Sequence, residues 1–254
     1  MCSTASAKRS RSPSHIRAVF FDLDDTLVED TLALEHCAEA AVREISPDLG
    51  IDPNALAVAY VDAAIDFWES LEPGGAPPAS GDIRPSMWRN ALRRFGVDDS
   101  ALAGRIARRY DELRLERAEL LPGAVPVLRA LHGRYKMSII TNGFAETHDV
   151  KIERLELRRF FDHVILAGEL RLVKPDPKIF KHALKLTGVT AGESVMVGDR
   201  YGRDIIGAHA AGMRAIWIQM RGEHVPPGGR EPEATIESIA ELPQALARLE
   251  AGTN

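Results

Sequence analysis

The sequence predicts an α/β protein with an open, doubly wound parallel sheet and an all-helical cap inserted after the first strand. Short apolar runs without alternation recur along the chain, which is typical of strands buried on both faces of a parallel sheet. Segments with helical spacing separate the later runs, as in successive βα units. The interval between the first two runs carries only helical patterns and is far too long for a crossover, which indicates an insertion.

The first expected strand is Ile16–Phe21, a run of branched and aromatic residues. The other expected strands are Met137–Ile140, Val164–Leu166, Val195–Val197 and Ala215–Ile218. A helix over Ala124–His132 returns the chain to the sheet after the insertion. The loop "EHVPPGGREPEAT" precedes a last short strand and helix.

Apolar residues at three- and four-residue spacing predict four helices in the insertion. These helices are Thr31–Ile45, Asn54–Leu71, Pro85–Phe95 and Ser100–Leu120. The segment "EPGGAPPASGD", Glu72–Asp82, is too rich in Gly and Pro for a helix, and we expect it to be the least ordered part. The predicted division is a disordered tail over 1–15, a Rossmann-like catalytic core over 16–30 and 121–254, and a helical cap over 31–120.

The composition is that of an ordinary globular protein. Of 254 residues, 45% are hydrophobic and 27% are charged, and the net charge of -5 does not favour binding to nucleic acid. No window approaches the roughly 18 to 20 apolar residues that a membrane span requires. The first sixteen residues lack the apolar stretch of a secretory signal. They are expected to form a disordered tail, and the alternative is a basic arm that binds nucleic acid through Lys8, Arg9 and Arg11. With only Cys2 and Cys37, a disulfide framework is excluded and a reducing cytoplasm is expected.

Polar residues come after each of the first four expected strands, toward the carboxyl edge of the sheet, where this fold class binds ligands. After the first four strands in turn, they are Asp22 and Asp24; Thr141, Asn142 and Gly143; Lys174 ahead of "PDP"; and Gly198 and Asp199, with Asp204 further on.

Several of these residues also have a structural interpretation. Asp199 could cap a helix, Thr141 and Asn142 could form a turn, and Lys174 could lie at the surface. Asp22 and Asp24 are harder to explain in this way, because two carboxylates just past a buried strand lose hydration at a high cost.

Together, the strand-end residues predict a Mg²⁺ and phosphate site. Mg²⁺ prefers oxygen ligands and usually shares carboxylates with substrate phosphate and water. The carboxylates of Asp22 and Asp199, with the backbone carbonyl of Asp24, would fit such an ion. Lys174 would neutralise phosphoryl oxygens, and the Thr141 hydroxyl would donate a hydrogen bond to them.

The motifs "DLDDTL", "TNGF", "LVKPDPKIF" and "VGDRYGRD" resemble, in order, the four motifs of the haloacid dehalogenase-like hydrolase superfamily. The resemblance covers nearly the whole chain from Ile16. An insertion between the first and second motifs resembles the members with a helical cap there, which include small-molecule phosphatases and dehalogenases. "TNGF" and "FFDHVILAGELRLVKPDPKIF" most resemble the branch of nucleotide and acylneuraminate phosphatases.

The resemblance implies a phosphatase that acts on small phosphate monoesters with Mg²⁺. It implies that Asp22 is the nucleophile and forms an aspartyl-phosphate, and that Asp24 is the general acid and then the general base. Thr141, Asn142 and Lys174 would hold the phosphoryl group. Asp199 would bind the metal with Asp22 and Asp24, and Asp204 would orient Lys174 or a metal-bound water. Asp25 is expected to point to solvent or to cap a turn.

Two groups of residues have less certain roles. Arg171 stands where relatives more usually carry small or polar residues; it could lie at the surface or contact an anionic substrate. In the cap, the candidates for selecting the substrate are Asp66, Trp68, Arg84, Trp88 and Arg89, although aromatic residues at helical spacing more often belong to a core.

Three other functions remain open. A 2-haloacid dehalogenase of the same fold needs neither a general acid nor a metal, so Asp24 and Asp199 favour phosphate transfer. A signalling receiver module places its acidic pair before its phosphoacceptor strand and has no helical insertion. A catalytically silent binding protein is disfavoured because every charged role is filled. Neither the physiological ester nor the oligomeric state can be predicted.

Overall fold

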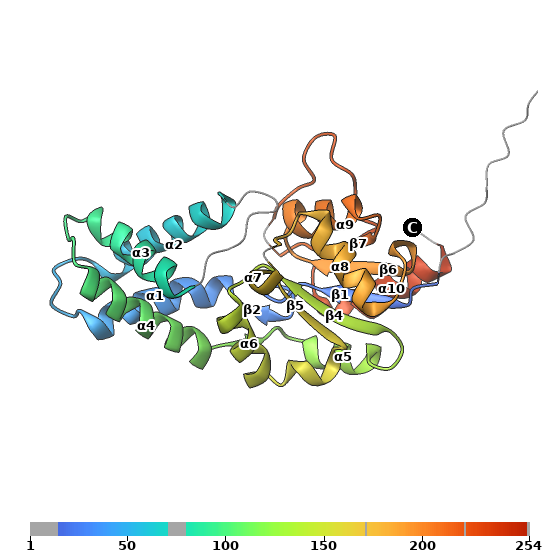
Figure 1. Ribbon diagram of the computed structural model, residues 1–254, viewed down its shortest axis with the longest axis horizontal. Coiled ribbons are helices and arrows are strands. Elements are labelled where there is room, and N and C mark those ends of the chain that lie inside the picture. Colours follow the sequence, from blue (N-terminus) through green and yellow to red (C-terminus); the bar gives the residue numbers. More distant parts are fainter. Residues whose placement is uncertain (1–14, 71–79, 171, 221, 253–254) are drawn as a thin grey trace, which may run out of the picture.

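The computed structural model describes residues 15–70, 80–170, 172–220 and 222–252. They form a core built on a sheet and a helical cap at one end of it (Figure 1). The predicted tail over 1–15 lies outside the described residues except for His15, and most of the predicted loop Glu72–Asp82 also lies outside them.

The sheet of the core is parallel throughout, with six strands within the described part of the chain. Their order is β5-β4-β1-β6-β7-β8. The strands are β1 (Ala18–Phe21), β4 (Lys136–Thr141), β5 (His163–Leu166), β6 (Ser194–Gly198), β7 (Arg214–Ile218) and β8 (Ala234–Ile236). The predicted fold class, a doubly wound parallel sheet with a helical cap, is confirmed.

Strand β1 lies at the switch point of the sheet. It pairs with β4 on one side and β6 on the other, so that Phe21 is in register with both Ile139 and Val197. The chain builds outward in opposite directions from β1, which opens a crevice at the carboxyl ends of these strands.

Apolar layers cover both faces of β1. Val19 and Phe21 belong to the layer on one face, and Ala18 and Phe20 to the layer on the other. This two-sided burial explains why the strand sequence does not alternate. The helices of the core are α5 (Ala124–Leu131), α6 (Ala145–Arg154), α7 (Ala167–Leu170), α8 (Pro177–Thr187), α9 (Ile206–Ala210) and α10 (Leu242–Ala251). The single-turn segments are η1 (Leu157–Phe160), η2 (Ala191–Glu193), η3 (Tyr201–Ile205) and η4 (Ile239–Glu241).

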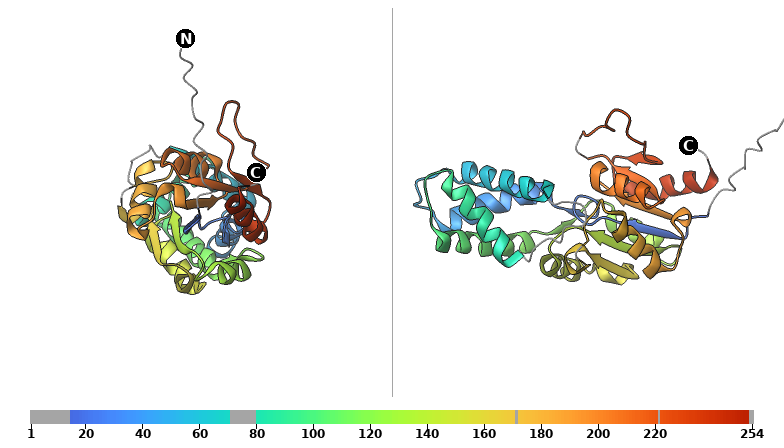
Figure 2. Two further views of the ribbon diagram at one scale, coloured as in Figure 1. Left: turned by 90° about the vertical axis from the view of Figure 1, so that its right-hand side faces the viewer. Right: turned by 45° about the horizontal axis from the view of Figure 1, so that its top comes forward.

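The cap is a helical bundle with a hydrophobic core of its own (Figure 2). Its helices are α1 (Thr31–Ile45), α2 (Pro53–Glu69), α3 (Ser80–Arg93) and α4 (Ser100–Glu116). In this core the ring of Tyr60 stacks on Trp88 with centroids 4.0 Å apart, and Tyr110 meets Tyr60 edge-on at 5.0 Å. Burial of large aromatic rings contributes strongly to the stability of such a small bundle.

Two predicted boundaries in the cap are wrong. Helix α4 ends at Glu116 rather than Leu120, because β3 (Glu119–Leu120) pairs antiparallel with β2 (Val28–Glu29). This ribbon joins the two segments by which the chain enters and leaves the cap. Helix α3 begins at Ser80 rather than Pro85, since Ile83 packs against the cap core and supports a further helical turn.

Candidate active site

The predicted site residues meet at the carboxyl edge of the sheet. Asp22 follows β1, Thr141 ends β4, and Asp199 follows β6, while Lys174 precedes α8. They line a cavity of about 710 Å³ between the core and the cap. The cap contributes Tyr60, Arg84, Tyr110 and Arg114, among others, to the same cavity.

Lys174 is buried between two carboxylates. Its Nζ lies 2.8 Å from Asp22 Oδ1 and 2.6 Å from Asp204 Oδ1. Burial alone would lower the pKa of Lys174, but Asp204 and Asp22 outweigh it and raise that pKa. The structural alternative of a surface lysine is therefore wrong, and Lys174 stays charged at the edge of the cavity.

Asn142 holds the backbone of Lys174. Its Nδ2 donates to the Lys174 carbonyl at 2.8 Å, and its Oδ1 accepts from the Lys174 amide at 2.7 Å. The loop after β4 thus fixes the loop before α8. The amide of Asn142 therefore has a positioning task, and its predicted contact with phosphate stays a prediction.

Among the described residues, Asp22, Asp199 and Asp204 form a buried acidic cluster, with one carboxylate oxygen of each within 4.8 Å of the others. Burial raises the pKa of Asp22 to about 6, although Lys174 opposes the shift. Burial, with the nearby charges of Asp22 and Asp204, raises the pKa of Asp199 to about 9. Such shifts mean that the cluster is short of positive charge.

A divalent cation fits this donor set. Hard cations take carboxylate oxygens, and the added charge would favour the ionised carboxylates against the burial that chiefly raises these pKa values and the repulsion that adds to it. Asp22 and Asp199 are the predicted ligands. The side chain of Asp24 points elsewhere, so only its backbone carbonyl remains available for the predicted contact.

The local backbone conformation places the Asp204 side chain in the acidic cluster. It lies in the π-helical turn η3, and its Oδ2 accepts from the Arg200 amide at 3.0 Å. A Cβ on Gly198 would overlap the carboxyl group of Asp204. Gly198, the first glycine of "VGDRYGRD", is therefore required for Asp204 to pack against β6.

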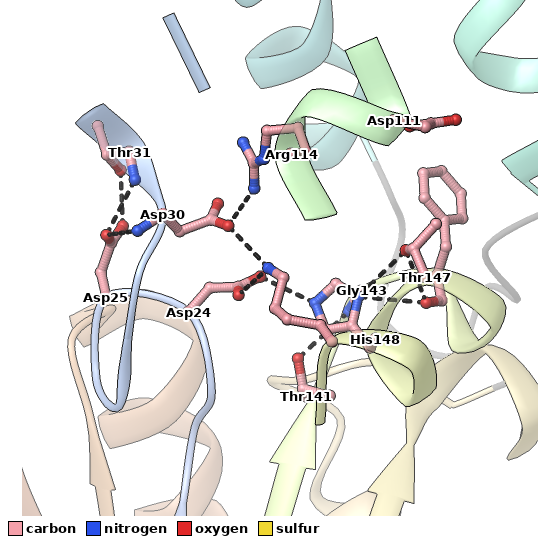
Figure 3. Close-up of polar contacts among 12 residues, drawn as sticks. Asp24, Asp25, Asp30, Thr31, Asp111, Arg114, Thr141, Gly143, Thr147 and His148 are labelled. Atoms are coloured by element: carbon pink, nitrogen blue, oxygen red, sulfur yellow. Dashed lines mark hydrogen bonds and ion pairs between the residues drawn. The ribbon is translucent and has the colours of Figure 1, made fainter. Parts of the chain in front are cut away.

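Asp24 has its own positive partners, which the sequence analysis missed. Its Oδ2 accepts from His148 Nε2 at 2.8 Å (Figure 3). Its Oδ1 accepts from Lys151 Nζ at 2.7 Å. Burial alone would raise the pKa of Asp24, but Lys151 and His148 hold that pKa well below its usual range. The two donors are three residues apart on α6, a spacing that places them on one face, and this was the available signal.

Gly143 makes room for this arrangement. A Cβ at this position would overlap the imidazole of His148. The backbone amide of Gly143 also donates to Thr141 Oγ1 at 3.5 Å. Consecutive residues of the motif "TNGF" therefore have different tasks. Thr141 supplies a hydroxyl, Asn142 holds the Lys174 backbone, and Gly143 leaves room for the His148 ring.

Asp25 is buried and caps the start of α1, so the solvent-exposed alternative is wrong and the capping alternative holds. Its Oδ1 accepts from the amides of Asp30 and Thr31, each at 3.0 Å, and the Thr31 hydroxyl donates to Oδ2 at 2.6 Å. Asp25 adopts a left-handed backbone with φ of 55°, which turns the chain toward the cap.

The predicted cap candidates lie in different places. Arg84 lines the cavity, where its guanidinium lies 5.6 Å from the Tyr110 centroid and 5.3 Å from that of Phe144. Trp88 is in the cap core, Arg89 pairs at the surface with Asp98, and Asp66 lines a smaller hollow between α2 and α3. The side chain of Trp68 and all of Arg171 lie outside the described residues.

Comparisons with known proteins identify relatives over most of the chain. Residues 16–212 match the haloacid dehalogenase-like hydrolase family. The chain is 29% identical over 240 residues to N-acylneuraminate-9-phosphatase of Mus musculus, covering 93% of this chain and 96% of that protein. It is 35% identical over 208 residues to glyceraldehyde 3-phosphate phosphatase of Pyrococcus abyssi, covering 80% and 82%.

Solved structures share the fold. The HAD-hydrolase YfnB of Bacillus subtilis, bound to magnesium, has a TM-score of 0.74 at 22% identity, with 91% of this chain and 99% of that chain covered. A 2-haloacid dehalogenase of Pseudomonas syringae has a TM-score of 0.65 at 33% identity, covering 92% and 99%.

Within the described residues, none of the helices has both the length and the apolar character that crossing a membrane demands. The strand order, the helical cap, the motif residues at the carboxyl edge of the sheet and the match over residues 16–212 lead to one conclusion. The chain belongs to the haloacid dehalogenase-like hydrolase family.

Proposed function

We propose that this protein is a Mg²⁺-dependent phosphatase that hydrolyses small phosphate monoesters through an aspartyl-phosphate on Asp22. The observation that carries the proposal is the buried cluster of Asp22, Asp199 and Asp204 beside the ammonium of Lys174. Similarity to phosphatases of N-acylneuraminate-9-phosphate and glyceraldehyde 3-phosphate supports a small phosphate ester as substrate.

In the first half of the reaction, an oxygen of Asp22 attacks phosphorus and the bond from phosphorus to the ester oxygen breaks. Asp24, carrying the proton that it takes from water in the second half of the preceding turnover, gives this proton to the departing alcohol. Lys174 holds the Asp22 carboxylate in place and offers positive charge to the phosphoryl oxygens. The Thr141 hydroxyl and the neighbouring backbone amides supply further donors.

In the second half, water attacks phosphorus and the bond to the Asp22 oxygen breaks, which regenerates the carboxylate. Asp24 takes the proton that the water loses. The ionised state that Lys151 and His148 favour in Asp24 suits this second task.

Mg²⁺ would be held by the carboxylates of Asp22 and Asp199 and the Asp24 carbonyl, with Asp204 orienting Lys174. When bound, it would neutralise phosphoryl oxygens and screen the carboxylates from one another. The helical cap would close over the cavity, exclude water and select the alcohol part of the ester. Arg84 and Tyr110 are the cap residues best placed for that selection.

A 2-haloacid dehalogenase is the second candidate, because one solved relative with that name is 33% identical to this chain. A halide leaves without protonation and without a metal. Asp22 would be the nucleophile in that reaction too, but a general acid at Asp24 and a metal ligand at Asp199 have no task in it, so these two residues favour phosphate transfer.

A phosphate-release screen tests the proposal. The purified protein is assayed with Mg²⁺ against nucleotides, sugar phosphates, phosphoglycolate, glyceraldehyde 3-phosphate and acylneuraminate phosphate, with 2-haloacids as the alternative substrates. We expect release of phosphate that stops with excess chelator and returns with Mg²⁺. Release of halide without metal, or full phosphatase activity after confirmed removal of the metal, would contradict it.

A further inference from the structure

A row of alternating charges runs from the cap to Asp24. Arg114 pairs with Asp30 (Figure 3). Asp30 Oδ1 lies 2.9 Å from Lys151 Nζ, and Lys151 Nζ lies 2.7 Å from Asp24 Oδ1. Positive and negative groups alternate along the row, so each inner member has an opposite charge on both sides.

The members of the row come from different parts of the fold. Arg114 is in α4, the last helix of the cap, and Asp30 is the residue just before α1, where the chain enters the cap. Lys151 is in α6 of the core, and Asp24 follows β1 at the cavity. The row therefore joins the cap to the residue proposed to transfer the proton.

Lys151 is the central member. Its side chain is only 8% exposed, and an isolated ammonium buried to that extent would be costly. The buried ammonium of Lys151 is stabilised because the carboxylates of Asp24 and Asp30 both accept hydrogen bonds from it. These two hydrogen bonds fix the position of Nζ. His148 holds the second oxygen of Asp24, so the carboxylate is restrained through both of its oxygens.

Such restraint matters for proton transfer. A general acid must lie within about 2.6 to 3.2 Å of the oxygen it serves, and small displacements cost large factors in rate. The restrained carboxylate lines the cavity, and Lys151 itself does not.

We propose that Lys151 is a positioning residue: held by Asp30, which Arg114 ties to the cap, it fixes the Asp24 carboxylate where the leaving oxygen of the ester can reach it. This inference rests on the proposed function, in which Asp24 gives a proton to the departing alcohol.

The test is the dependence of the first chemical step on the leaving group. Formation of the aspartyl-phosphate is measured in single turnovers with Mg²⁺, using one alkyl phosphate and nitrophenyl phosphate. An alkyl alcohol leaves poorly without a proton, whereas nitrophenol needs little help. Asp24→Asn is the reference and should slow the alkyl ester far more than the aryl ester.

Lys151→Met should reproduce this selectivity, with a loss for the alkyl ester at least about 10-fold larger than for the aryl ester. Lys151→Arg keeps the charge and should restore much of the alkyl rate. The matched control is Arg154→Met, one helical turn further along α6. Arg154 donates to the Glu116 carbonyl of the cap helix at 2.6 Å, and no described contact joins it to Asp24 or Asp30. It should leave the ratio of the two rates unchanged.

Asp30→Asn is the second variant. It tests whether Lys151 positions Asp24 even if Lys151→Met fails to fold. Asp30 makes no side-chain cap bond to α1, because Asp25 caps that helix, so the helix start is retained. We expect a smaller loss of the same selectivity.

The outcomes separate the two claims. If Asp24→Asn slows aspartyl-phosphate formation from both esters by the same factor, the proposed role of Asp24 is wrong, and this inference is wrong with it. If Asp24→Asn is selective but Lys151→Met and Asp30→Asn slow both esters by the same factor, Lys151 is merely structural and only this inference is overturned.

Discussion

Lys174 and Asp204 form a buried ion pair, with Nζ 2.6 Å from Oδ1 and neither side chain more than 2% exposed. The same ammonium reaches Asp22 at 2.8 Å. The charge of Lys174 thus balances two members of the acidic cluster, the proposed nucleophile Asp22 and Asp204, although the three residues lie far apart in the sequence.

Lys174→Met should lower kcat/KM by at least about 100-fold, because it removes the cation that holds Asp22 and that is proposed to face the phosphoryl group. The matched control is Lys178→Met in α8, where the side chain is 73% exposed. Steady-state kinetics of both variants check the prediction. Equal, few-fold effects in the two would show that Lys174 has no special task.

Asp199→Asn should abolish the stabilisation that Mg²⁺ gives to the protein. A ligand that binds only the folded state raises its stability, so the melting temperature of the wild type should rise with Mg²⁺ concentration. The variant should melt no lower than the wild type without metal, since the raised pKa of Asp199, about 9, leaves its carboxyl uncharged at neutral pH and the amide replaces it without loss of charge. Thermal melting with Mg²⁺ alone measures both effects, with the exposed Asp149→Asn as control. A full Mg²⁺ response in Asp199→Asn contradicts the assigned ligand.

Glu233→Gln should destabilise the protein in a pH-dependent way. Burial alone would raise the pKa of Glu233, but hydrogen bonds from His209 and the Ala215 amide lower it from 4.5 to about 2. A lowered pKa stabilises the fold above the unfolded value, and this contribution is lost as pH falls from about 4.5 toward 2. The variant should therefore lose about 1 to 2 kcal/mol at pH 7 and progressively less below pH 4.5. Urea unfolding at several pH values measures this, and a difference independent of pH would contradict it.

The core of the site could be predicted because parallel strands bring their carboxyl ends to one edge. Asp22, Thr141 and Asp199 each follow a recognisable buried strand, so their meeting depends only on sheet topology. Lys174 could be added because "KPDP" lies next to a strand and starts a helix.

The partners of Asp24 could not be predicted in the same way. His148 and Lys151 come from a helix face, and their target depends on how α6 is rotated against the sheet. Asp30 and Arg114 meet only when the cap has folded back on its own entry segment. In the sequence, each of these residues has the pattern of an ordinary charged residue on an amphipathic helix or in a turn.

Short elements were also missed for a physical reason. Strands β2 and β3 have two residues each, too few to show any periodicity, and their pairing is a long-range contact. The helical pattern of α4 therefore seemed to continue to Leu120.

The central claim is that Asp22 carries the phosphoryl group, and one measurement tests it most directly. The wild type is mixed with a rapidly reacting phosphate ester and Mg²⁺, quenched in acid during turnover, digested, and analysed by mass spectrometry, with Asp22→Asn treated in parallel. The account predicts one added phosphoryl group on the peptide that contains Asp22, lost in Asp22→Asn, which should remain folded but inactive. Phosphate on another residue, or near wild-type turnover by Asp22→Asn, would contradict it.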